Sequence, residues 1–424
     1  MRVLIVNTSE TAGGAAVAAR RLMHALQNHG VKARMLVRDK QTDDPGVSAL
    51  PRQQWQQWHF LWERLRIYMA LHMQRAHLFK IDTATGGADI TALPEFREAD
   101  VVHLHWVNQG MLSLKGIARI LRSGKPVVWT MHDAWPATGI CHLTLGCQHF
   151  KSRCQRCPLL PGGGSATDLS TRTWRRKQAL YDNAGIHFVA CSRWLEGEAR
   201  QSALLAHQHV TSIPNAIDTR IYCPGNGHER QQLGLPTDKR LILFVSQRAT
   251  DIYKGMDYLL QACRLMAEQH PETRQQTALL VMGGHAEEVT EGQAVPFEVI
   301  PLGYVNDERR KVDIYRAADV FVLPSLSENL PNTIMEAMAC GTPTVGFRVG
   351  GIPEMTEHRK TGYVAQYRSA DDLANGLYHV LYEADRTAMS QACVAKVQHT
   401  WSERQVALRY IELYNEALAM KHYL

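Results

Sequence analysis

Two carboxylates and two cations carry the chemistry that the sequence suggests. Glu328 and Glu336 are separated by seven residues within the stretch 324–355, and Arg248 and Lys254 lie further upstream. Carboxylates accept hydrogen bonds from sugar and ribose hydroxyls. Arg and Lys side chains bind pyrophosphate oxygens through charge-assisted hydrogen bonds. The four residues therefore predict a site for a ligand that combines hydroxyl groups with a diphosphate.

The segment around the two glutamates is typical of a strand, a loop, a helix and a second strand. Residues 319–323 are apolar and rich in β-branched side chains, which predicts a buried strand. Residues 334–339 form the expected helix, which ends before a Gly and a Pro, and residues 344–347 begin the next strand. In open α/β sheets ligands bind where strands end and helices begin. Glu328 in the loop and Glu336 on the helix are therefore expected to face one ligand.

This stretch resembles a known enzyme family. Glu328, Glu336 and the following Ala-Met-Ala-Cys-Gly-Thr-Pro resemble the E-x7-E signature of retaining GT-B glycosyltransferases of family four, the glycosyl transferases of group 1. The resemblance implies an α/β fold of two Rossmann-like domains that face a central cleft, with a C-terminal helix that crosses back to the first domain. It also implies metal-independent transfer from a nucleotide-sugar donor to a glycan or lipid-linked glycan, in bacterial exopolysaccharide, capsule or lipopolysaccharide biosynthesis.

The resemblance implies a role for each residue that matches a family motif. Arg248 and Lys254 match an Arg and a Lys that stabilise the departing diphosphate. Glu336 would hold the ribose of the donor, and Glu328 would contact the donor sugar. Arg248, Lys254 and Glu328 are therefore the candidate catalytic residues.

Further donor contacts are implied at Gly13, Gly14, His132, Asn329 and Leu330. Two glycines between a strand and a helix let a ligand approach the backbone, but Gly13 and Gly14 fit a plain tight turn equally well. His132 follows a strand and fits a structural histidine as well as a donor contact. Asn329 and Leu330 stand where many relatives have Gly and Phe. Since Asn tolerates left-handed backbone geometry, the loop is expected to keep its shape.

The length of 424 residues predicts two domains. We place the first domain at 1–222 and the nucleotide-sugar-binding domain at 223–402, with residues 403–424 returning to the first. The Gly-Asn-Gly-His sequence at 225–228 is typical of a linker between domains.

The composition predicts a soluble, cytoplasmic protein. Hydrophobic residues make up 45% of the chain and charged residues 21%. The first residues predict a strand rather than a signal peptide, and no apolar run has the length of a membrane span. A net charge of +6 favours anionic ligands or lipid headgroups and argues against nucleic acid as a partner.

A tryptophan-rich stripe recurs at helical spacing early in the chain, at Trp55, Trp58, Trp62, Leu65, Met69 and Met73. Such a stripe is usually the core-facing side of a helix, and this is our interpretation. The alternative is a helix that lies in a membrane interface, because basic residues stand between the apolar ones. Peripheral contact with the inner face of the cytoplasmic membrane therefore stays open.

Four of the nine cysteines fall close together, at Cys141, Cys147, Cys154 and Cys157. Stable disulfides are not expected in a reducing cytoplasm, so a structural zinc site of four thiolates is one hypothesis. Only Cys154 and Cys157 have the close spacing of a zinc-ligand pair. Unligated thiols in a compact loop are the alternative. No catalytic metal or other cofactor is expected.

Two other functions remain open at this stage. A nucleotide-sugar 2-epimerase would share the fold and the nucleotide site but would convert its substrate without an acceptor. A non-catalytic carbohydrate-binding protein would keep the fold without needing the charged residues. The presence of Arg248, Lys254, Glu328 and Glu336 together argues against this second alternative.

Overall fold

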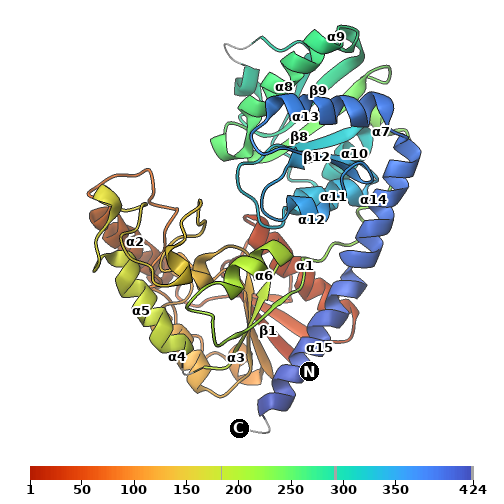
Figure 1. Cartoon of the computed structure of the whole chain (residues 1–424). Coiled ribbons are helices and arrows are strands. Elements are labelled where there is room, and N and C mark those ends of the chain that lie inside the picture. The colour runs from red at the N-terminus through yellow and green to blue at the C-terminus, as the bar shows by residue number, and fades with distance from the viewer. Residues whose placement is uncertain (183, 291–293, 422–424) are drawn as a thin grey trace. The chain divides into compact units, whose positions relative to one another are not determined.

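The computed structural model describes residues 1–182, 184–290 and 294–421, and it divides into two compact units (Figure 1). Unit 1 comprises residues 1–216 together with the residues from Val406 onward. Unit 2 comprises residues 217–405. The division thus falls at 216/217 and 405/406, where the sequence analysis placed the boundaries at 222 and 402.

Unit 1 is built on a seven-stranded parallel sheet with the order β3-β2-β1-β4-β5-β6-β7. Its strands are β1 (Arg2–Ser9), β2 (Lys32–Asp39), β3 (Val47–Ala49), β4 (Val101–Leu104), β5 (Val127–Met131), β6 (Ile186–Ala190) and β7 (His209–Ser212). The chain builds outward from β1 in one direction and then from β4 in the other. This reversal creates a topological switch point between β1 and β4.

Helices cover both faces of this sheet. They are α1 (Gly14–Asn28), α2 (Gln53–Ala70), α3 (Pro94–Glu98), α4 (Leu114–Arg122), α5 (Leu169–Tyr181), α6 (Arg193–Arg200) and α15 (Glu403–Lys421). Apolar residues of α1 and α15 share one buried cluster with the sheet, and those of α3 to α6 share the other. From Val406 onward α15 packs in unit 1, so the predicted return of the last helix to the first domain is confirmed.

Buried polar contacts fix α15 on the sheet. His103 on β4 bonds Tyr414 Oη through Nδ1 and Thr130 Oγ1 through Nε2, each at 2.7 Å. The hydroxyl of Tyr410 lies 2.9 Å from the same Thr130 oxygen. Burial lowers the pKa of His103 to about 3, so the imidazole is neutral at pH 7 and satisfies these hydroxyls without a buried charge.

Unit 2 has a six-stranded parallel sheet with the order β10-β9-β8-β11-β12-β13 and the same doubly wound arrangement. Its strands are β8 (Arg240–Arg248), β9 (Thr277–Gly284), β10 (Glu298–Gly303), β11 (Val320–Leu323), β12 (Thr344–Phe347) and β13 (Gly362–Ala365). The switch point lies between β8 and β11. These are the strands that the sequence places before Lys254 and Glu328.

The helices of unit 2 also lie on both faces. They are α7 (Glu229–Leu233), α8 (Met256–Gln269), α9 (Thr273–Gln276), α10 (Glu308–Ala317), α11 (Asn332–Ala339), α12 (Ile352–Met355), α13 (Ala370–Tyr378) and α14 (Arg386–Thr400). Residues of α8 and α13 share a core with Val320 and Val322 of β11. Phe321, which alternates with these valines, packs edge-on against Tyr315 of α10 on the other face.

Short turns complete the two units. They are η1 (Trp135–Ala137), η2 (His149–Lys151), η3 (Pro161–Gly163), η4 (Ile252–Lys254), η5 (Glu287–Thr290) and η6 (His379–Glu383). Among the described residues, no helix combines the length and the apolar composition required to cross a bilayer.

The interpretation of the tryptophan stripe as core-facing is wrong. The side chains of Trp55, Trp58 and Trp62 on α2 are 63%, 68% and 56% exposed, and Leu65 and Met69 are exposed as well. The opposite side of α2 is buried instead. Periodicity located the helix correctly but could not show which of its two faces the core would receive, because that depends on partners far away in the sequence.

Candidate functional site

Lys254 and Glu328 meet at the switch point of unit 2. Lys254 ends the turn that follows β8, and Glu328 lies in the loop that follows β11. Lys254 Nζ donates to Glu328 Oε1 at 2.5 Å, with the two side chains 32% and 12% exposed. The carboxylate raises the pKa of Lys254, against the effect of burial. The predicted cation and the predicted sugar-binding carboxylate therefore form one ion pair at the place where doubly wound sheets bind ligands.

A glycine allows the two loops to come together. Gly255 has φ +74°, and a Cβ at this position would lie 1.9 Å from the carbonyl oxygen of Pro324. The backbone N–H of Leu326 donates to the carbonyl of Tyr253 at 2.8 Å in the same region. Only glycine permits this close approach of the backbones. The Lys-Gly sequence thus places the ammonium group beside the loop that carries Glu328.

A pair of adjacent glycines, Gly350 and Gly351, supports the Glu328 loop from another side. A Cβ at Gly350 would lie 1.6 Å from the carbonyl oxygen of Glu328, and one at Gly351 would lie 2.0 Å from that of Asn329. The turn between β12 and α12 therefore packs directly on the backbone of the site. Asn329 is not among the residues with positive φ, so the loop does not use the left-handed geometry that Asn tolerates. Leu330 is buried below the loop.

Arg248 is the last residue of β8 and is exposed. Its Nε donates to Thr250 Oγ1 at 3.2 Å. The backbone N–H of Asp251 donates to the carbonyl of Arg248, and that of Lys254 donates to the carbonyl of Asp251. One short hydrogen-bonded turn therefore carries both cations that the sequence assigns to a diphosphate.

Glu336 is held from within the protein. It lies on α11, is 8% exposed, and accepts a hydrogen bond from the hydroxyl of Tyr315 at 2.9 Å. Burial and the neighbouring Glu336 raise the pKa of Tyr315 well above its usual value, so the phenol stays protonated and donates. The contact with Tyr315 fixes the direction of the Glu336 carboxylate. No local pattern in the sequence predicts this contact, because the two residues lie on different helices.

The predicted glycine turn in unit 1 lies at the start of α1. Gly13 is the N-cap residue with φ +91°, and a Cβ there would meet no protein atom within 4 Å. The positive φ favours glycine at this position for the backbone itself. Gly14 begins the helix. The two glycines therefore form the expected turn between β1 and α1.

His132 follows β5 and forms part of a histidine chain. Its Nε2 lies 2.8 Å from Nδ1 of His105, and its Nδ1 lies 3.3 Å from Sγ of Cys191. Burial lowers the pKa of His132 to about 4, although Asp133 opposes this effect. His132 is therefore neutral at pH 7. His105, which the sequence analysis did not single out, follows β4 and shares this environment.

The cysteine loop of unit 1 gives no preformed metal centre. Among the described residues, no group of three or more His, Cys, Asp or Glu side chains has an arrangement that could hold a metal ion. Cys154 and Cys157 are buried, and Cys141 and Cys147 are partly buried. Burial raises the pKa of both Cys154 and Cys157 to about 12. As arranged here, these two thiols are protonated.

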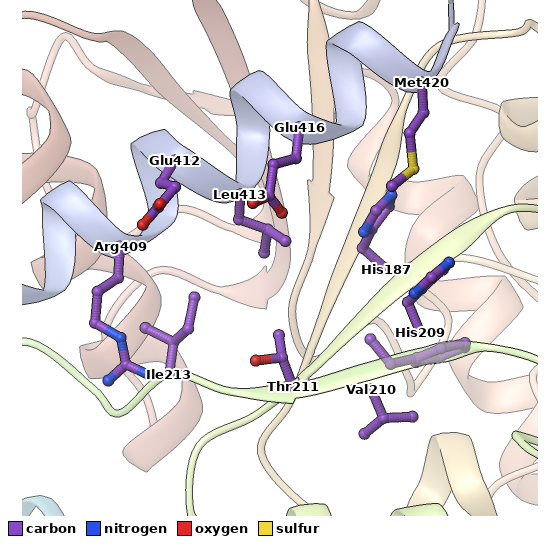
Figure 2. Close-up of a pocket in the computed structure, with 11 residues that line it drawn as sticks. His187, His209, Val210, Thr211, Ile213, Arg409, Glu412, Leu413, Glu416 and Met420 are labelled. Atoms are coloured by element: carbon purple, nitrogen blue, oxygen red, sulfur yellow. The ribbon is translucent and has the colours of Figure 1, made fainter. Parts of the chain in front are cut away.

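A pocket of about 390 Å³ lies elsewhere in unit 1, between β6, β7 and α15 (Figure 2). His187 and His209 stack beside it with ring centroids 5.5 Å apart, and Glu412 and Glu416 extend from α15. None of the residues predicted to bind the donor lines this pocket. The candidate site in unit 2 therefore lies at its switch point and does not involve this cavity.

Comparison with known proteins assigns both units. A family model described as Glycosyltransferase Family 4 matches residues 12–221, and one described as Glycosyl transferases group 1 matches residues 239–383. The first match falls almost wholly in unit 1 and the second falls in unit 2. The chain belongs to the family 4 glycosyltransferases.

Individual relatives of this family 4 chain share sequence over part of their length. The D-inositol 3-phosphate glycosyltransferase of Thermobispora bispora is 29% identical over 241 residues, which cover 53% of this chain and 55% of that protein. The chain thus spans about half the length of the curated relative that it matches.

Solved structures match over nearly the whole chain. Sucrose-phosphate synthase from Thermosynechococcus elongatus has a TM-score of 0.66 at 20% identity and covers 99% of both chains. The Anabaena protein HepE in complex with UDP-glucose has a TM-score of 0.63 at 16% identity, over 98% of this chain and 100% of that one. At these identities the likeness concerns the fold, and the predicted GT-B fold is confirmed.

In this family 4 chain the structure brings some of the predicted residues together and leaves others apart. Lys254 and Glu328 are in direct contact, and Arg248 shares their turn. The hydrogen bond described above for Glu336 is made with Tyr315, and not with Lys254, Glu328 or Arg248. The sequence did not predict the supporting role of the glycines, although the pair at 350–351 and the glycine directly after Lys254 are visible in it.

Proposed function

We propose that this family 4 chain is a retaining glycosyltransferase that uses a nucleotide-sugar donor and needs no catalytic metal. The sugar would be transferred to a hydroxyl of a glycan or lipid-linked glycan, in the synthesis of a bacterial surface polysaccharide or lipopolysaccharide. The observation that carries this proposal is the Lys254–Glu328 ion pair at the switch point of unit 2.

The cations answer the main electrostatic requirement of the reaction. When the bond between sugar and diphosphate breaks, negative charge grows on the leaving phosphate oxygen. Lys254, whose pKa is raised, remains charged at neutral pH, and Arg248 adds a second positive charge from the same turn. Fixed charges directed at developing charge lower the barrier because they need no reorganisation during the reaction. Side chains thereby take over the neutralisation of the diphosphate.

The two glutamates would bind different parts of the donor. Glu328 is bound to Lys254, so it lies beside the diphosphate position and is suited to the adjoining sugar. Glu336 is oriented by Tyr315 and is suited to the hydroxyls of the ribose. Asn329 and Leu330 follow Glu328 and would shape the sugar site. The assignments of Gly13, Gly14 and His132 to donor binding belong to the same proposal.

A thermal-shift screen tests donor binding first. We expect one of the nucleotides UDP, GDP and ADP, together with its sugar conjugates, to raise the Tm, because a ligand that binds only the folded state stabilises it. Release of nucleoside diphosphate from the sugar form is then measured with and without candidate acceptor glycans. Acceptor-dependent release with an α- or β-linkage that matches the donor supports retaining transfer. Conversion of the nucleotide sugar without any acceptor would identify an epimerase instead.

A further inference from the structure

Helix α2 of unit 1 exposes its apolar side and buries polar residues, which is the reverse of an ordinary surface helix. We call its exposed side the tryptophan face, formed by Trp55, Trp58, Leu61, Trp62, Leu65 and Met69. Of the seventeen large hydrophobic side chains exposed among the described residues, eight lie between 55 and 79. The ionisable side chains of Glu63 and Arg64 are buried on the opposite side. An apolar patch of this kind marks an interaction surface.

The buried contacts prevent α2 from turning its tryptophans inward. Arg64 forms a 2.7 Å ion pair with Asp82. Glu63 accepts hydrogen bonds from the backbone N–H groups of Thr83 and Thr85 at 3.2 and 3.0 Å. Rotation of the helix would break these buried polar contacts. The buried carboxylate of Asp82 would then lose its cationic partner, which is energetically costly. The outward direction of the tryptophan face is thus built into unit 1.

The backbone of α2 is also closely packed. A Cβ at Gly86 would lie 2.7 Å from the carbonyl oxygen of His59, and one at Gly110 would lie 2.8 Å from the backbone nitrogen of Phe60. Two loops therefore approach the middle of the helix as closely as glycine allows. The tryptophan face is presented by a rigidly seated helix.

The cysteine loop extends the same region (Figure 1). Ile81 pairs with Cys141 in a β-bridge, and Nδ1 of His77 lies 2.9 Å from the carbonyl oxygen of Leu159. This neighbouring loop exposes Leu143 and Leu145 as well. Two segments distant in sequence therefore contribute apolar side chains to one region of unit 1.

The charge of this region is of one sign. Glu63 is the one acidic residue in the sequence between 51 and 80, and it is buried, whereas Arg52, Arg66 and Arg75 are exposed. The sequence from 141 to 166 contains no Asp or Glu, and Lys151 and Arg156 are exposed there. An apolar face rich in Trp and flanked by exposed cations complements a surface that is apolar below and anionic above.

We propose that the tryptophan face binds the surface of a bilayer that contains anionic lipids, with α2 lying in the plane of the interface. Tryptophan rings favour the level of the headgroups, where one edge of the ring is solvated and the rest is in contact with acyl chains. The arginines at both ends and on the flank of α2 bind the headgroup phosphates. None of the residues proposed to bind the donor belongs to the tryptophan face.

Vesicle flotation tests the proposal with the full chain. Wild-type protein is expected to bind phosphatidylcholine vesicles that contain about one third phosphatidylglycerol, and to bind pure phosphatidylcholine far less. The Arg52→Gln Arg66→Gln Arg75→Gln variant should bind the anionic vesicles about a hundredfold more weakly. Each arginine near the surface contributes about fivefold to the affinity, and the three contributions multiply. Arg309→Gln Arg310→Gln, which removes two exposed cations of unit 2, is the control and should bind as the wild type does.

The apolar part is tested by Trp55→Gln Trp58→Gln Trp62→Gln, with Trp194→Gln as the matched control because Trp194 is also exposed but lies on α6. The triple variant should lose most vesicle binding and the blue shift of tryptophan fluorescence, whereas its Tm should not fall, since these side chains are exposed. Equal vesicle binding by the triple variant and the wild type would overturn the proposal. The proposal would also be overturned if the wild-type protein does not bind vesicles but forms dimers that the triple variant cannot form. The partner of the tryptophan face would then be a second copy of the chain.

Discussion

Replacing Lys254 by alanine tests the proposed chemistry most directly. The change removes the charge that would stabilise the departing diphosphate, and we expect turnover to fall by roughly a hundredfold or more, since loss of one such group costs about 3–4 kcal/mol of transition-state stabilisation. Stability should change little. Lys254 is about one third exposed, and an ion pair of this kind contributes about 0.2–1 kcal/mol.

Unit 2 offers a matched control for this experiment. Lys239 pairs with Glu298 at 2.7 Å and precedes β8, so it lies at the strand end opposite to Lys254. Lys239→Ala therefore removes the same side chain and a comparable ion pair at a place remote from the switch point. Both variants should lower the Tm by no more than about 4 °C, the shift expected for about 1 kcal/mol in a unit of this size.

The assay is the steady-state release of nucleoside diphosphate in the presence of donor and acceptor. The expected result is a large fall in kcat for Lys254→Ala and wild-type turnover for Lys239→Ala. A rise in KM with unchanged kcat would show that Lys254 binds the ground state and the transition state equally. Turnover of Lys254→Ala within about threefold of that of the control would refute the role of Lys254 in stabilising the leaving group.

Four further outcomes are expected. Glu336→Ala should weaken binding of the free nucleoside diphosphate in isothermal titration, whereas Glu328→Ala should keep this affinity and lose turnover; the opposite pattern would exchange the two roles. Transfer should survive EDTA, because side chains neutralise the leaving diphosphate. Burial and the neighbouring Asp82 raise the pKa of Glu63 to about 8 from 4.5, so the folded protein keeps a proton that the unfolded chain releases, and stability falls between these pH values. The Tm of Glu63→Gln relative to wild type should therefore rise as the pH is raised from about 5 to about 8. Cys154 and Cys157, with pKa values raised to about 12, should react slowly with iodoacetamide at pH 7. If the purified protein instead contains about one equivalent of zinc, and the Cys154→Ser Cys157→Ser variant loses it, the cysteines form a thiolate site.

Local signals in the sequence were sufficient for much of unit 2. The strand before Glu328 is a short apolar run, and the helix after it ends at a Gly and a Pro, so both elements follow from nearby residues. The contact of Glu336 with Tyr315 does not, because it depends on how two helices pack on one face of the sheet. The glycine contacts at 350–351 likewise depend on the distance between two loops, which no local pattern encodes.

Helix α2 shows a different limit. Its apolar residues recur with the same period whether they face a core or a membrane, so the spacing of Trp55, Trp58 and Trp62 could not decide between the two. The core-facing direction is excluded by the other face, where Arg64 pairs with Asp82, a residue beyond the end of the helix. A charged residue within an apolar period was therefore the informative signal, because a buried charge needs a partner and thereby fixes the direction of the helix.

The two switch points of the chain differ in charge, and this difference supports the assignment of the diphosphate to unit 2. Both units have the doubly wound strand order and present loops at equivalent positions. In unit 2 these loops carry Arg248 and Lys254, and the pKa of Lys254 is raised so that the ammonium group persists. In unit 1 the loops after β1 and β4 carry a glycine turn and His105, whose pKa burial lowers well below its usual value, so that this residue adds no positive charge at pH 7. A diphosphate needs the first environment, because the second offers it hydrogen bonds without neutralising its charge.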